Sequence, residues 1–185
     1  MKKISLLFSF ILLTTTWGVA QDINTPAAGK SLVIFTRPVI DAPLVKFAYF
    51  DNEHFLGKIG PGSYVAYECD PGEHLFWAKA ENRDFLEADL EADQIYLIET
   101  KVTTGMVKAR IQLVPYGPNV KSAEKLKERL LARIAKRDEV RVDAGSVQAE
   151  AEADLEGIIE KGMAAYQKLK KKGKEVDVLT PDMHI

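Results

Sequence analysis

The sequence predicts a mainly β protein, an immunoglobulin-like or prealbumin-like β-sandwich of about seven to eight antiparallel strands followed by two C-terminal α-helices. Two observations support this fold class. From Ser31 to Tyr116, short apolar runs alternate with turn residues, a spacing typical of all-β domains. After Pro118 the composition changes to Ala, Glu, Lys, Leu and Arg, with apolar residues at helical spacing. We therefore expect a β-sandwich domain over 31–116 and helices over 121–173.

Two of the apolar runs alternate clearly. Leu86, Ala88 and Leu90 alternate with acidic residues, and in the segment 107–113 apolar residues at the odd positions alternate with polar residues at the even ones. Each is expected to be a strand with one face in the core and one face in water. The other runs are apolar on both faces or nearly so, as central strands of two packed sheets are. They cover residues 32–36, 45–50, 64–69, 75–80 and 95–100.

Turn residues separate these runs. Residues 60–63 read Gly-Pro-Gly-Ser, and residues 70–73 read Asp-Pro-Gly-Glu. In both, proline stands where φ of about −65° is wanted and glycine where φ must be positive, the signature of type II turns. A third reversal is expected at 51–53. The number of runs suits an immunoglobulin-like sandwich, although the cysteine pair and the tryptophan signature of that fold are absent from the sequence.

The first helix is expected over 122–138. Its apolar stripe contains Leu126, Leu130 and Ile134, and such a stripe must cover another apolar surface. The connection to the second helix is short enough for antiparallel neighbours. We therefore expect residues 121–173 to form a helical hairpin or, alternatively, helices that dock on another protein or on a second copy.

The second helix is expected over 146–172. Acidic residues crowd its start and lysines crowd its end, which the helix dipole favours, and Gly173 supplies a stop signal. The lysines could alternatively bind an anionic lipid or lipopolysaccharide, but a solvated helix end already explains them. Residues 174–185 are expected to be a flexible tail that includes His184.

Several short pieces occur in order within residues 31–116: VIFTRP at 33–38, YFD at 49–51, LGKI at 56–59, GSY at 62–64, PGEH at 71–74 and QIYLIE at 94–99. In this order they resemble the bacterial family known as domain of unknown function 2846, found in secreted and lipoprotein envelope proteins. The resemblance implies a β-sandwich, and the family brings no established reaction or ligand. The lipid-anchoring cysteine of many members is missing here, and the residues after Val120 lie outside the match.

The N-terminus has the three parts of a secretory signal peptide. Two lysines precede an apolar stretch over 4–13, and small residues at Gly18 and Ala20 suit a signal peptidase. The stretch is about half of the roughly 20 residues that a bilayer-spanning helix needs, and no cysteine follows the signal to take a lipid. We therefore expect residues 1–20 to be removed, Gln21 to begin the mature chain, and the protein to be periplasmic or secreted without a lipid anchor.

The expected mature chain has a small net charge. Removing the signal leaves 23 of the 25 basic residues against 27 acidic ones, a formal net charge of −4 instead of −2. This balance argues against general nucleic-acid binding, which usually shows a clustered basic face. No later apolar run is long enough to span a membrane. Cys69 is the only cysteine, so no intramolecular disulfide can form, and we expect a buried thiol at the end of a strand.

Residue patterns for catalysis or metal binding are sparse. His54 and His74 follow turns near acidic residues, but zinc ligands usually come in tight pairs, and neither His-x-His nor Cys-x-x-Cys occurs. His74 is expected instead to bond turn backbone, and Glu87 and Asp89 to lie on a solvated strand face. No nucleophile elbow, phosphate loop or dinucleotide fingerprint is present. We therefore expect neither an enzyme nor a cofactor or metal site.

Aromatic side chains are the remaining binding candidates. Exposed rings could stack on sugars or on a peptide, but core packing is the default. Trp77 is the first to consider, because it stands opposite in parity to Phe76 and Ala78, and one of the two sets must face outward. The candidates are Phe47, Tyr49, Phe50, Tyr64, Tyr67, Phe76, Trp77 and Tyr96.

Together these features favour a non-catalytic exported envelope module that acts as a binding or assembly platform. Its expected contact is a protein partner, or a second copy, bound through the C-terminal helices. The alternative is a carbohydrate-binding or glycan-processing accessory domain, with a weak metal-assisted hydrolase as a third hypothesis.

Overall fold

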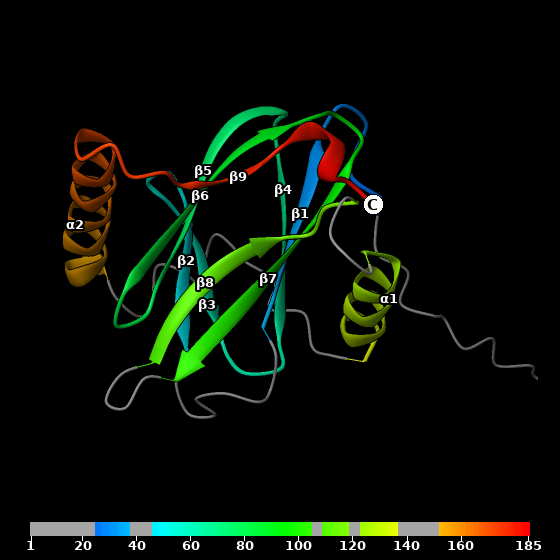
Figure 1. Ribbon diagram of the computed structural model, residues 1–185, viewed down its shortest axis with the longest axis horizontal. Helices are drawn as coiled ribbons and strands as arrows, with labels where there is room; N and C mark the ends of the chain where they lie inside the picture. The colour runs from blue at the N-terminus through cyan, green and yellow to red at the C-terminus, as the bar shows by residue number, and fades with distance from the viewer. Residues whose placement is uncertain (1–24, 38–45, 105–108, 119–122, 137–151) are drawn as a thin grey trace, which may run out of the picture.

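The computed structural model describes residues 25–37, 46–104, 109–118, 123–136 and 152–185, and in this part of the chain two β-sheets pack face to face (Figure 1). The four-strand sheet has the order β4 (Tyr64–Cys69), β1 (Ser31–Thr36), β7 (Ile95–Thr104), β8 (Ala109–Pro115). The five-strand sheet has the order β3 (His54–Ile59), β2 (Phe47–Asp51), β5 (Gly72–Lys79), β6 (Arg83–Leu90), β9 (Asp177–Leu179). The helices are α1 (Ala123–Ile134), α2 (Glu152–Lys171) and the short 3-10 helix η1 (Pro181–Met183).

The main core lies between the two sheets. Alternate residues of each strand point into it, Val33 and Phe35 from β1 and Phe76 and Ala78 from β5. This alternation is the period of two that strands impose on their side chains. The expectation of a mainly β protein with two packed sheets is confirmed. The strands are not all antiparallel as expected, because β1 pairs in parallel with β7 and β6 pairs in parallel with β9.

The outer face of the four-strand sheet is covered by α1. Leu32, Ile34 and Leu97 point away from the main core and form a second cluster with Leu130 and Ile134 of the helix. Burial of each large aliphatic side chain is worth roughly 1.5–3 kcal/mol. The runs at 32–36 and 95–100 are apolar on both faces because one face packs in the main core and the other packs against α1.

The outer face of the five-strand sheet is covered by α2. Phe50, Leu75, Trp77 and Phe85 form a third cluster there. The helix residues that pack on this cluster lie along one face of α2, and they are Leu155, Ile158, Ile159, Met163, Tyr166 and Leu169.

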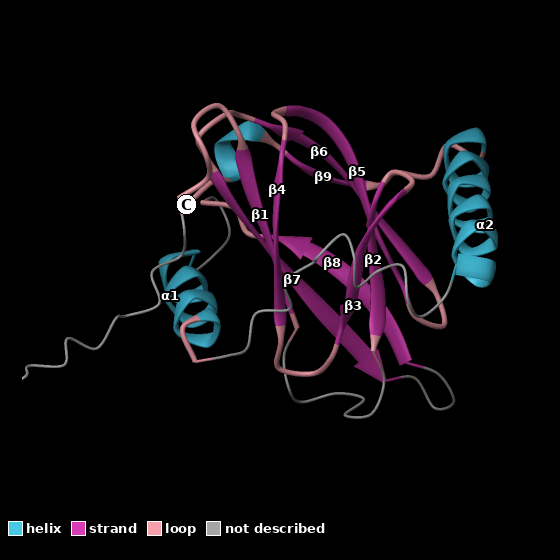
Figure 2. Ribbon diagram, turned by 180° about the vertical axis from the view of Figure 1, so that it is seen from behind, coloured by secondary structure: helices cyan, strands magenta, loops and turns pink. Residues whose placement is uncertain are grey.

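The two helices therefore lie on opposite sides of the sandwich, as Figure 1 and Figure 2 both show. They do not form the helical hairpin that the pattern over 121–173 led us to expect. The described residues of each apolar stripe pack on the apolar outer face of a sheet, so they are covered within the chain. The expected connection over 139–145 and the side chain of Leu126 lie outside the described residues.

The final segment is built into the sandwich instead of forming the flexible tail expected over 174–185. Leu179 of β9 is fully buried in the main core, and β9 adds to the edge of β6. Beyond it, the Ile185 backbone N–H donates to the Ile95 carbonyl oxygen of the other sheet, and His184 pairs with Tyr96. A three-residue strand with a single core residue carries almost no periodic signal, which explains the difference from the sequence-based expectation.

The predicted turns at 60–63 and 70–73 have the glycine conformations that they require. Gly62 has φ of 80° and the Ser63 N–H donates to the Gly60 carbonyl oxygen at 3.3 Å, as in a type II turn. Gly72 has φ of 113°. Cys69 is buried at the end of β4, as predicted.

Some sequence-based predictions fall outside the described residues. These are the signal peptide at 1–20, the mature start at Gln21 and the first residues of the second helix at 146–151. Within the described residues, neither helix has the combination of length and apolar character needed to cross a membrane.

Candidate functional site

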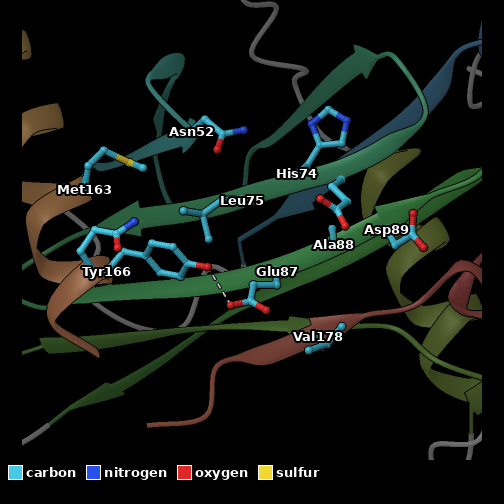
Figure 3. Close-up of a pocket in the computed structure, with 11 residues that line it drawn as sticks. Asn52, His74, Leu75, Glu87, Ala88, Asp89, Met163, Tyr166 and Val178 are labelled. Carbon is cyan, nitrogen blue, oxygen red and sulfur yellow. Dashed lines mark hydrogen bonds between the residues drawn. The ribbon is translucent and has the colours of Figure 1, made fainter. Parts of the chain in front are cut away.

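The candidate site is a pocket between α2 and the outer face of the β5–β6 hairpin (Figure 3). Its volume is about 490 Å³, within the range of small-molecule sites. Five segments contribute to its walls: the β2–β3 turn, β5, β6, α2 and β9. The lining residues are Asn52, Glu73, His74, Leu75, Glu87, Ala88, Asp89, Met163, Tyr166, Gln167 and Val178.

The register of β5 and β6 decides which side chains meet at this pocket. Glu73 stands directly opposite Asp89, and Leu75 stands directly opposite Glu87. These four share the parity of Trp77, which packs under α2, so they lie on the helix-covered face of the sheet. Two carboxylates that face each other across neighbouring strands repel, which is a destabilising arrangement.

Glu87 is tied to α2. Its Oε1 accepts hydrogen bonds from the Tyr166 hydroxyl at 2.8 Å and from the Lys170 ammonium at 2.7 Å. The hydrogen bond from Lys170 is the main cause that lowers the pKa of Glu87, followed by the bond from Tyr166. The expected solvated acidic face is therefore only partly present, because one of its carboxylates holds the helix.

Trp77 holds α2 against the sheet from below. Its ring is fully buried, stacks on Phe50 at 3.9 Å between centroids, and donates its Nε1–H to the Asn52 carbonyl oxygen at 2.7 Å. A Cβ built on Gly162 would collide with the ring, so the helix backbone lies directly on the indole. Trp77 does face away from the main core, as its parity allowed, but α2 covers it. It is therefore not a platform for sugars.

Most of the other aromatic candidates are packed in the interior. Tyr67 is only partly buried, and its hydroxyl donates to Asp51 Oδ2 at 3.1 Å. The fully or almost fully buried ones are Phe47, Tyr49, Phe50, Tyr64, Phe76 and Tyr96.

His74 borders the pocket, but its ring points to the opposite face of β5 (Figure 3). Its Nδ1 lies 2.8 Å from Asp51 Oδ2, and its Nε2 lies 2.8 Å from the Asp70 carbonyl oxygen. Both acceptors are oxygen atoms, so both ring nitrogens donate and the ring is an imidazolium. The hydrogen bond to Asp51 is the main cause that raises the pKa of His74 to about 10.

This ion pair is a structural clamp. The two side chains are 12% and 7% exposed, and together they fix the turn before β5 to the end of β2. An imidazolium has no lone pair to bind a metal or to accept a proton. The expected bond from His74 to turn backbone is present at Asp70, while the bond to the Asp51 carboxylate is an addition that turn spacing did not indicate.

The other histidines do not join His74 in a ligand set. The His54 ring lies 6.0 Å from the Tyr67 ring, and His184 Nδ1 lies 3.0 Å from the Pro181 carbonyl oxygen. Among the described residues, no group of three or more His, Cys, Asp or Glu side chains could hold a metal ion.

Sequence reasoning missed the pocket itself. Glu87 and Asp89 were evident as alternating acids, but their relation to Glu73 depends on the β5–β6 register, and the pocket wall depends on where α2 docks. The short turn between the two strands was the available signal for that register. No family model matches the chain, and no curated protein matches it.

Proposed function

We propose that the protein is a non-catalytic exported module of the cell envelope that acts as a binding or assembly platform. Its ligand or partner is bound at the pocket between α2 and the β5–β6 hairpin. The observation that supports this proposal most is the pocket of about 490 Å³, which is lined by carboxylates, amides and apolar side chains. Concave sites of mixed polarity are the usual places for ligand binding.

The pocket replaces the C-terminal helices as the place of contact. The expectation of a protein partner or of self-association through the helices rested on apolar stripes in need of cover. The described residues of those stripes are covered by the sheets, so they leave a partner little apolar helix surface to bind. The pocket keeps a hollow, partly polar surface open instead.

A binding role fits the chemistry of the pocket better than catalysis. The pocket is bordered by a histidine whose two nitrogens already donate to protein oxygens, and general base catalysis needs an unprotonated, reachable nitrogen. Glu87 is held in its charged form by Lys170 and Tyr166, which disfavours a general acid at this position.

The export and family assignments belong to the same proposal. The signal peptide over 1–20 supports a periplasmic or secreted location without a lipid anchor. The ordered pieces over 31–116 support a relationship to domain of unknown function 2846. The strand orders β4-β1-β7-β8 and β3-β2-β5-β6-β9 differ from the immunoglobulin order, in which the first, second, fifth and fourth strands share a sheet, and therefore favour the prealbumin-like alternative.

The second candidate is a carbohydrate-binding accessory domain. One observation favours it: the pocket combines amides of Asn52 and Gln167 with carboxylates of Glu73 and Asp89 and the ring of Tyr166. Such groups can hydrogen-bond sugar hydroxyls and stack on a sugar face. The burial of Trp77 under α2 removes the largest ring that this function could have used.

Two measurements test the proposal. Fractionation of cells that express the full chain should recover a soluble envelope or secreted protein whose first residue is Gln21. Crosslinking with a photoreactive residue at Gln167 should capture a ligand or partner that the same residue placed at Glu81, remote on the β5–β6 turn, does not capture. An intact Met1, or equal capture from both positions, would overturn the proposal.

A further inference from the structure

We propose that the pocket between α2 and the β5–β6 hairpin binds a ligand that carries a primary ammonium group on an aliphatic stem, as a lysine side chain does. This inference rests on the proposed function, since it assigns a chemical class to the ligand of that same pocket. Three observations support it: a pair of carboxylates without an ion-pair partner in the described part of the chain, a neighbouring carboxylate that already binds a lysine of this chain, and an exposed apolar side chain beside them.

The first observation is an uncompensated pair of carboxylates. Glu73 and Asp89 face each other across β5 and β6, and both are exposed. Among the described residues, the ion pairs include neither of them. Side chains directly opposite on antiparallel strands have Cβ atoms about 4.5–5.5 Å apart, so a single ammonium group can reach both carboxylates.

The second observation concerns the neighbouring carboxylate, Glu87: the same face of β6 already holds an ammonium group. The Lys170 Nζ lies 2.7 Å from Glu87 Oε1 and 6.0 Å from the centre of the Tyr166 ring. Glu87 and Asp89 are two residues apart on one strand face, about 6.5–7 Å along the strand. The protein therefore pairs Glu87 with its own lysine and leaves the neighbouring Asp89 and Glu73 without an ion-pair partner among the residues that the structure describes.

The third observation concerns the stem of the ligand. Val178 is 46% exposed and is the one large hydrophobic residue exposed among the residues that the structure describes. It lines the same pocket as Leu75 and Met163. An aliphatic stem can cover Val178 and the partly buried Met163 while its charged end stays at the carboxylates, as lysine stems do on protein surfaces. A bare metal ion would use neither this apolar surface nor the available volume.

Calorimetric titration of the chain that begins at Gln21 tests the inference with four probes. These are N-acetyl-lysine methylamide, the diamine cadaverine, the neutral N-acetyl-norleucine methylamide and the glycan chitotriose. We expect the two amines to bind and the norleucine derivative to bind at least about tenfold more weakly, because charge-assisted hydrogen bonds contribute most of the binding free energy. Added salt should weaken the binding of both amines.

Variants of the carboxylate pair provide the matched controls. Glu73→Gln and Asp89→Asn should each weaken amine binding by about tenfold. Glu81→Gln removes an exposed acid at the far end of the same hairpin and should leave binding unchanged. Binding of the lysine derivative alone would identify a peptide as the source of the ammonium group, and equal binding of cadaverine would identify a free amine.

Other outcomes separate this inference from the proposed function. If norleucine or chitotriose binds as tightly as the amines, and Gln167→Ala weakens that binding, the ammonium assignment is wrong while the pocket remains a ligand site. If amine binding is equal in the Glu73, Asp89 and Glu81 variants, the amines bind elsewhere and the inference is wrong. If none of the four probes binds, the ammonium assignment fails, and crosslinking from Gln167 then decides the proposed function separately.

Discussion

Gly162 of α2 lies directly on the indole ring of Trp77, with no room for a Cβ atom between the helix backbone and the ring. The ring cannot yield, because it is stacked on Phe50 and fully buried. Gly157, about 1.4 turns earlier in the same helix, has open space at its Cβ position. This contrast between two glycines of one helix defines how α2 is seated.

Gly162→Ala should therefore lower the free energy of unfolding by about 1–3 kcal/mol through overpacking, even though alanine is the better helix former. Gly157→Ala should raise it by roughly 0.5–1 kcal/mol. Urea denaturation followed by the fluorescence of Trp77 measures both. Equal changes in the two variants would show that α2 does not sit on Trp77.

Leu130 connects α1 to the outer face of the four-strand sheet, so its truncation should affect the whole body. Leu130→Ala should cost about 2–5 kcal/mol, as for other buried leucines. Because Trp77 lies on the other sheet, its fluorescence and the helical circular dichroism should still change in one transition. Glu128→Ala, an exposed site on the same helix, should stay within about 0.5 kcal/mol of the wild type. Two separate transitions would show that α1 and the two sheets do not unfold as one cooperative unit.

The His74–Asp51 pair should make the protein less stable as the pH rises above neutral. The folded-state pKa of His74 is raised from 6.5 to about 10, so the charged ring stabilises the fold fully below about pH 6.5. This contribution should fall as pH rises from 6.5 toward 10 and the ring loses its proton. Melting temperatures measured across this range should decline, and Asp51→Asn should flatten the decline. An unchanged slope in Asp51→Asn would contradict the clamp.

Leu179 and Val178 are neighbours on β9 with opposite surroundings. Leu179 is fully buried between the sheets, and Val178 is 46% exposed. Leu179→Ala should therefore cost about 2–5 kcal/mol in chemical denaturation, while Val178→Ala should stay within about 0.5 kcal/mol of the wild type. A small effect of Leu179→Ala would instead support the flexible tail expected over 174–185.

Local signals predicted much of the sandwich. Alternation gave β6 and most of β8, and paired proline and glycine gave the turns at 60–63 and 70–73. These features depend on neighbours in sequence, where periodicity and turn chemistry act. The same signals could not distinguish a sheet that is buried by a second sheet from one that is also covered by a helix.

The site depended on relations between distant segments. The meeting of Glu87 with Lys170 joins residues 83 positions apart, and β9 closes the pocket wall from the end of the chain. The amphipathic pattern of α2 showed that it needs an apolar surface but not which surface. The close packing of Gly162 on Trp77 determines that α2 covers the five-strand sheet, and this shape complementarity cannot be read from periodicity.

The central claim is that the ligand site lies between α2 and the β5–β6 hairpin. The most direct test is an amide chemical-shift titration of isotope-labelled protein, beginning at Gln21, with N-acetyl-lysine methylamide. The account predicts saturable shifts concentrated at Glu73, Asp89, Gln167 and Val178, the residues around the open carboxylates and the apolar patch. Shifts that gather around α1 and the four-strand sheet, or that never saturate, would contradict it.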